Sequence, residues 1–131
     1  MAYAFKMDGI SYDVIVPVGG FKRKGDMLDG PNVGRATNGA MIFDTVGMYY
    51  NYSLTINRSG NNVAAYDALY EAATSPSRRA HTVEMLYGQG TIAFTAYVSG
   101  VTDELDKVEN GVQYWDSMTL DIIAVKPYRT P

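Results

Sequence analysis

The sequence predicts a mainly β (α+β) fold: an antiparallel β-sandwich or half-barrel with one flanking α-helix and a long inter-strand loop. Three observations predict it. Apolar and polar residues alternate with a period of two along several segments, as in half-buried β-strands. One segment, between Asn61 and Pro76, spaces its apolar residues by three and four, as in an amphipathic helix. Residues 26–46, in contrast, carry turn-forming residues and few apolar ones.

The N-terminal segment predicts a β-hairpin. Two extended runs flank Asp8-Gly9, a pair that tolerates the positive φ angles of a type I′ turn. Pro17 ends the second run, because proline has no N–H group for a ladder. The segment GFKRKGDML (20–28) then predicts a short strand whose charges face solvent or a partner. The mainly apolar face of the second run comprises Ile10, Tyr12, Val14 and Val16.

Residues Asp26 to Val46 predict a long connection without regular structure. Asp29-Gly30-Pro31-Asn32 and Asn38-Gly39 are turn formers, because they tolerate unusual φ angles or bond to their own backbone. The short apolar run Met41–Phe43 would dock the far end of this loop on the domain. A loop of this length in a compact domain usually binds something or is disordered.

The next segments predict a strand, then a helix, then two strands joined as a hairpin. A face shared by Met48, Tyr50, Tyr52, Leu54 and Ile56 predicts a half-buried strand. The helix that follows would be capped by Asn61 or Asn62 and ended by Ser75-Pro76. Two further strands, joined at Gly88–Gly90, would bury alternate residues: His81, Val83, Met85 and Tyr87, then Ile92, Phe94, Ala96 and Val98.

The C-terminal third predicts a second irregular region and a closing strand. The segment VTDELDKVENGVQYW (101–115) is acidic and rich in turn formers, so it is either a second long loop or a distorted strand. In the closing strand Met118, Leu120, Ile122 and Ala124 share one face, and Lys126-Pro127 stops it.

Composition excludes several classes of function. A chain of 131 residues with 47% hydrophobic and 19% charged residues fits one globular domain. The absence of cysteine excludes disulfides, thiol nucleophiles and cysteine-ligated metals. A net charge of −3 argues against sequence-specific nucleic-acid binding, which usually needs a basic face. Because no apolar stretch has the form of a signal peptide or a membrane span, we expect folding in a cytosol and no membrane insertion.

The chemistry-bearing residues predict no catalytic, cofactor or metal site, and so no enzyme. The single histidine, His81, shares a strand face with Val83, and no serine elbow motif accompanies it. Asp26, Asp29 and Asn32 lack the alternating ligands and terminal glutamate of a calcium loop, so we interpret them as turn formers. The run Lys22-Arg23-Lys24 lacks the helix and the Ser or Thr of a P-loop. It is either a solvated strand edge or a surface that pairs with an acidic partner.

Eleven tyrosines give the chain side chains that suit interfaces, because tyrosine is half apolar and half polar. The pattern places Tyr50 and Tyr52 in the core. Three other tyrosines would either stack on sugars or be buried in a subunit contact, and the sequence is compatible with both. They are Tyr49, Tyr97 and Tyr114.

One stretch carries a family resemblance. The basic strand, the LDG…GR…G.M..D..G.YYNY run within residues 21–56, and the helix around Tyr66-Asp67-Ala68-Leu69 are similar to small tail-associated structural proteins of Gram-positive siphophages and prophages. The likeness covers more than half of the chain. The element order also resembles the tail-tube fold that tail-tube, distal tail and type VI secretion tube proteins share.

The resemblance implies a single tail-tube-like β-sandwich domain over residues 1–131. It implies a virion structural protein of the tail or baseplate, made and assembled in the cytoplasm of a host bacterium. Its partners would be its own copies, in a ring, and other phage tail or baseplate proteins. The long loop would reach a neighbouring subunit, with interface residues Lys22, Arg23, Lys24, Asp29, Arg35, Asp44 and Tyr49. The alternative is a carbohydrate- or receptor-binding β-sandwich module.

Overall fold

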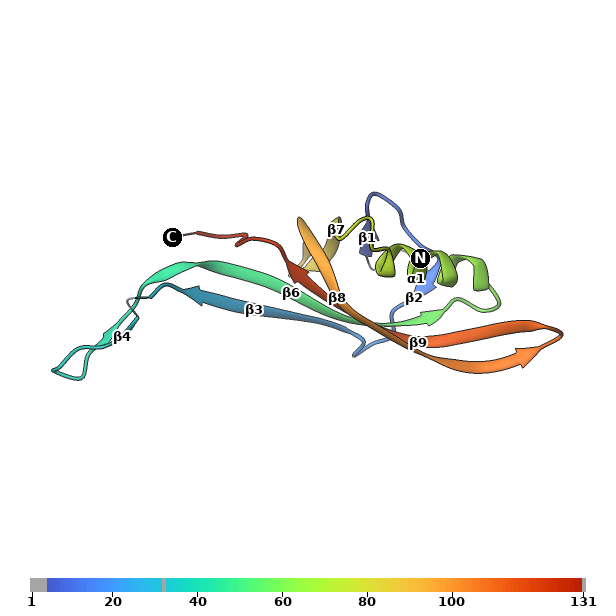
Figure 1. Ribbon diagram of the computed structural model, residues 1–131, viewed down its shortest axis with the longest axis horizontal. Coiled ribbons are helices and arrows are strands. Elements are labelled where there is room, and N and C mark those ends of the chain that lie inside the picture. The colour runs from blue at the N-terminus through green and yellow to red at the C-terminus, as the bar shows by residue number, and fades with distance from the viewer. Residues whose placement is uncertain (1–4, 32, 131) are drawn as a thin grey trace.

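The computed structural model describes residues 5–31 and 33–130, which form one long antiparallel sheet, a small hairpin and one helix. The elements in chain order are β1 Phe5–Met7, β2 Val14–Ile15, β3 Phe21–Asp29, β4 Gly34–Arg35, β5 Met41–Ile42, β6 Thr45–Arg58, α1 Val63–Thr74, β7 Ala80–Tyr87, β8 Gly90–Glu109 and β9 Val112–Ala124. The strand order in the sheet is β1-β7-β8-β9-β6-β2, and β3 also pairs with β6. The sheet curls into a half-barrel, with α1 along one side of its middle (Figure 1). Of the two predicted architectures, the structure has the half-barrel.

The core lies between the helix and one face of the sheet. The period-two patterns predicted for the strands hold, because Tyr52, Leu54 and Ile56 of β6 are buried and their neighbours in sequence are more exposed. The helix contributes three buried side chains to the same core. These are Tyr66, Leu69 and Ala73. From β7, β8 and β9 the buried residues are His81, Val83, Met85, Ile92, Ala96, Met118, Leu120, Ile122 and Ala124.

The helix begins and ends where the sequence predicts. The Oδ1 atom of Asn62 accepts a hydrogen bond from the N–H of Ala65 at 3.1 Å, and this satisfies one of the free donors of the first turn. The side-chain amide of Asn62 also donates to Asp13 at 2.7 Å, which ties the helix start to the N-terminal segment. Ser75, just before Pro76, has extended backbone angles and ends the helix.

The predicted N-terminal hairpin is half right. Asp8 and Gly9 have φ angles of 56° and 79°, as a type I′ turn requires. The two flanking runs, however, form only one isolated bridge, between Met7 and Ile10. Strand β1 pairs with β7 instead, and β2 pairs with β6. The runs separate because each pairs with a different, longer strand.

The prediction of a structureless loop over residues 26–46 is wrong. Strand β3 stays paired with β6 out to Asp29, opposite Thr45, and β4 and β5 form a short hairpin beyond that point. Of the predicted turn formers, Asn38-Gly39 lie in a tight turn at Ala36–Ala40, where the Ala36 N–H donates to the Ala40 carbonyl at 2.7 Å, and Asn32 lies outside the described residues. We call residues 26–48 the β3–β6 arm.

The second irregular region is a distorted strand, one of its two predicted forms. Strand β8 continues through the acidic segment as one partner of β9, with three irregularities in their register. Asn110 and Gly111, with φ angles of 52° and 78°, make the turn between them. We call residues 102–116 the β8–β9 arm. The two arms extend from the core in opposite directions along the longest axis of the molecule (Figure 1).

Candidate functional site

The residues predicted for a subunit interface all lie on the β3–β6 arm or on β3 and β6 beside it. Most of their side chains are exposed, whereas Asp44 and Tyr49 are half-buried. Two of the charges already have neighbours within the chain: Lys24 lies 3.3 Å from the carboxylate of Asp26, and Arg35 donates to the carbonyl of Gly39 at 3.0 Å. The structure therefore places the predicted interface residues along the β3–β6 arm and on the parts of β3 and β6 next to it: Lys22, Arg23, Lys24, Asp29, Arg35, Asp44 and Tyr49.

The β3–β6 arm also exposes large apolar side chains. Phe43, predicted to dock the loop on the domain, is instead 74% exposed, because the arm extends away from the core. The exposed apolar residues of this arm are Met27, Leu28, Met41, Ile42, Phe43 and Val46. A concentration of this kind usually marks a surface that another molecule covers.

The β8–β9 arm is acidic and is anchored to the core by one arginine. The Arg58 backbone N–H donates to Asp116 at 2.8 Å, and its guanidinium donates to the carbonyl of Trp115 at 3.0 Å. The same guanidinium pairs with Asp106 at 3.4 Å. The exposed acidic residues of the arm are Glu104, Asp106 and Glu109, and its exposed apolar residues are Leu105, Val108 and Val112.

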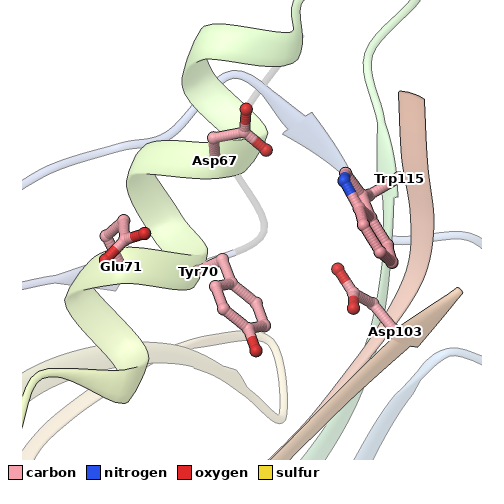
Figure 2. A pocket seen from close by; sticks show the side chains of 5 residues that line it. All are labelled: Asp67, Tyr70, Glu71, Asp103 and Trp115. Carbon is pink, nitrogen blue, oxygen red and sulfur yellow. The ribbon is translucent and has the colours of Figure 1, made fainter. Parts of the chain in front are cut away.

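A hollow of about 330 Å³ lies between α1 and the base of the β8–β9 arm (Figure 2). Its deepest carboxylate, on Asp103, accepts a hydrogen bond from the Tyr66 hydroxyl at 3.2 Å. Burial raises the pKa of Asp103, and burial together with the Asp103 charge raises the pKa of Tyr66. The hollow is lined by Asp67, Tyr70, Glu71, Asp103 and Trp115. Within the described residues no group of three or more histidine or acidic side chains is placed to hold a metal ion.

The single histidine is part of a buried clasp between β1 and β7. His81 is 2% exposed, and its Nδ1 atom lies 2.7 Å from the Asp8 carboxylate. The other carboxylate oxygen of Asp8 accepts from the Thr82 N–H at 3.0 Å and lies 3.3 Å from Arg78. Burial on its own would raise the pKa of Asp8, but these hydrogen bonds and the positive charges lower it overall. The sequence indicates Asp8 only as a turn residue, because its partner His81 is 73 residues away along the chain.

A second cluster that the sequence did not indicate joins three tyrosines and two arginines. The ring of Tyr50 lies 5.2 Å from that of Tyr87 and 5.8 Å from that of Tyr128, between centroids. The Tyr87 hydroxyl donates to the Tyr50 hydroxyl at 3.2 Å. The Arg23 guanidinium lies 5.3 Å from the centre of the Tyr87 ring, and the Arg129 side chain is close enough to the Tyr50 hydroxyl to lower its pKa. We call these five residues the tyrosine–arginine cluster.

The structure does not bring together the three tyrosines predicted either to stack on sugars or to be buried in a subunit contact. Tyr49, Tyr97 and Tyr114 lie on β6, β8 and β9, and no ring contact between any two of them occurs in the described part of the chain. Tyr114 lies out on the β8–β9 arm, where Arg58 and Lys107 each approach its ring to 4.9 Å.

No protein family, curated protein or solved structure matches the chain. Along residues 5–31 and 33–130 there is no helix long and apolar enough to cross a membrane.

Proposed function

We propose that the chain is a structural protein of a phage or prophage tail or baseplate that assembles with copies of itself, most simply as a ring. One observation carries the self-assembly: two long hairpin arms leave the core in opposite directions and expose large apolar side chains (Figure 1). An isolated two-stranded hairpin is marginally stable in water, so arms of this kind gain most when another surface covers them. The tail or baseplate origin rests on the resemblance of residues 21–56.

The sheet itself supports the same proposal. The outer edge of β3 pairs with no other described strand, and its lysines suit an edge that must not pair at random. The face of the sheet opposite the helix is polar, with Ser53 and Thr55 on β6 and Thr119 and Asp121 on β9. A polar face of this kind suits the wall of a water-filled channel.

The charges suggest how copies would meet. The cationic run Lys22-Arg23-Lys24 and the acidic β8–β9 arm belong to different regions of the same subunit. A contact between the cationic run of one copy and the acidic arm of the next uses two different surfaces. Such a head-to-tail contact closes into a ring when its rotation permits, and extends into a filament otherwise.

The test is the solution mass by light scattering over a range of protein concentrations, with electron microscopy of the same samples. We expect a discrete species several times the 14.4 kDa of one chain. Replacing the exposed apolar residues at the arm tip, in the double variant Ile42→Ser/Phe43→Ser, should lower the assembled fraction. The control is Val18→Ser, which removes an even more exposed apolar side chain outside the arms. A strict monomer at every concentration, or equal loss in the control, would contradict the proposal.

A further inference from the structure

The tyrosine–arginine cluster holds hydrogen-bond donors that the protein does not itself use. The Arg23 guanidinium lies 5.3 Å from the centre of the Tyr87 ring, and because the side chain is exposed its N–H groups remain accessible. Within the described residues, no hydrogen bond or ion pair engages them. Lys24 beside it has one carboxylate neighbour, Asp26, and its ammonium group remains largely exposed.

Arg23 and Lys24 line a small hollow. Its volume is about 280 Å³, just below the lower end of about 300 Å³ for pockets that hold drug-sized ligands, so it suits a single ring. An adjoining hollow of about 390 Å³ shares Tyr50 and adds Arg129. The first is lined by Arg23, Lys24, Gly25, Tyr50, Tyr52 and Tyr87. The second is lined by Met27, Thr45, Gly47, Met48, Tyr50, Arg129 and Thr130.

The local charge is opposite to that of the chain. Three cationic side chains line the two hollows and no carboxylate does, although the whole chain carries a net charge of −3. This environment also affects the pKa of Tyr50. The hydrogen bond from Tyr87, followed by that from Arg129, lowers the pKa of the Tyr50 hydroxyl. Groups that stabilise a negative phenolate oxygen would likewise stabilise an anionic oxygen of a ligand.

We propose that the tyrosine–arginine cluster binds a sugar that carries an acidic group, a carboxylate or a phosphate. The anionic oxygens lie on Arg23 and Lys24, where bidentate contact with a guanidinium is available. The apolar face of the sugar ring lies against the tyrosine side chains, and its hydroxyls exchange hydrogen bonds with the phenol groups. This inference does not require self-assembly, and it concerns the unassembled chain, because the proposed subunit contact uses the same Arg23 and Lys24. It also differs from sugar stacking on Tyr49, Tyr97 or Tyr114.

The experiment is isothermal titration calorimetry of the full chain with four probes: glucuronate, glucose 6-phosphate, glucose and inorganic phosphate. We expect saturable binding of glucuronate or glucose 6-phosphate that weakens at high salt, and no measurable binding of glucose. Inorganic phosphate should bind roughly ten-fold more weakly than the charged sugar that binds best, because it makes no contact with the rings. Binding of only one charged sugar would identify the acidic group that the site takes.

Three variants test the assignment of residues. Arg23→Gln should weaken binding roughly ten-fold or more, as expected for a lost charge-assisted hydrogen bond. Tyr50→Phe, which keeps the ring and removes the hydroxyl, should weaken it by a smaller factor. Arg79→Gln is the control, because Arg79 is an exposed arginine outside both hollows. The mass of each sample is measured in parallel, because Arg23 is also expected at the subunit contact.

Four outcomes would overturn the proposal. They are no binding of either charged sugar, glucose binding as tightly as the charged sugars, inorganic phosphate binding as tightly as they do, and equal loss of affinity in Arg79→Gln. The first means that the cluster is only structural. Equally tight binding of glucose would mean that the cations play no role. Equally tight binding of inorganic phosphate would mean that the site binds an ion without recognising the sugar. Equal loss of affinity in Arg79→Gln would mean that the attraction between charges is non-specific.

Discussion

Gly47 is the residue against which the C-terminal segment packs. A Cβ atom at this position would lie 2.5 Å from the Cβ of Pro127 and 2.8 Å from the Arg129 carbonyl oxygen. The neighbouring Met48 exchanges backbone hydrogen bonds with Arg129 and Tyr128 at 2.8 and 2.9 Å. Because residue 47 has no side chain, the C-terminal segment can lie against β6. This contact positions Tyr128 and Arg129 of the tyrosine–arginine cluster.

We expect Gly47→Ala to release this segment at a cost of about 1–3 kcal/mol, as for overpacking at a close contact. Hydrogen exchange should show lost protection at the amides of Met48 and Tyr128, and urea denaturation should show the lower stability. Gly90→Ala is the control, because a Cβ at Gly90 meets nothing within 4 Å and its φ angle is not positive. Unchanged protection at Met48 would show that the contact with Gly47 does not hold the segment.

The Asp8–His81 clasp predicts a pH dependence of stability. The pKa of Asp8 in the folded chain is lowered from its ordinary 3.8, so its ionised form stabilises the fold above that pH and the contribution is lost as pH falls through the folded value. Asp8→Asn keeps a residue type that tolerates the positive φ angle. We expect it to lower the free energy of unfolding by about 1–2 kcal/mol at neutral pH. The difference from the native chain, measured by urea denaturation, should shrink below about pH 4. A difference that stays constant with pH would contradict the role of the ionised carboxylate.

At the scale of elements, the sequence predicts what is set by local periodicity and misses what is set by distant pairing. The helix from Val63 to Thr74 and the buried faces of β6 and β9 follow from spacing alone, because each contributes one regular apolar face. The β3–β6 arm does not, since its extended form depends on a ladder between residues far apart in the chain. The tyrosine–arginine cluster has no sequence signal at all, because it requires β3, β6, β7 and the C-terminal segment to converge.

The β8–β9 arm, in contrast, contains a sequence feature that predicts a hairpin. Asn110-Gly111, between Val108 and Val112, is a typical type I′ hairpin turn. Gly111→Ala should cost about 1–2 kcal/mol in the arm, because the φ angle of 78° is unfavourable for a residue with a Cβ. The core should be unaffected, so we expect hydrogen exchange to speed up at residues 104–115 only. Gly111→Asn, which tolerates this backbone better, should keep most of the protection. Equal exchange in the native chain and the alanine variant would mean that the turn does not hold the arm together.

For the whole molecule, the distribution of charge and apolar surface matters more than the small net charge. The central core is closed by the helix, whereas exposed apolar side chains also lie on both arms, far from that core (Figure 1). The cationic run lies on β3 and the acidic residues lie on the β8–β9 arm. The run of one copy is therefore complementary in charge to the arm of another copy. A head-to-tail contact lets the cationic run of each copy meet the acidic arm of the next copy.

This arrangement predicts the result of a charge swap. Reversing the acidic arm with Glu104→Lys/Glu109→Lys should abolish assembly, because it would face the cationic run of the neighbour with like charge. Reversing the run with Lys22→Glu/Lys24→Glu should do the same, and a chain with all four changes should assemble again, since each surface then meets its opposite. Light scattering at low and high salt measures all four chains, and the assembled fraction should fall with salt wherever assembly occurs. If the four-fold variant stays monomeric while both double variants remain folded by circular dichroism, these two surfaces are not partners in the assembly.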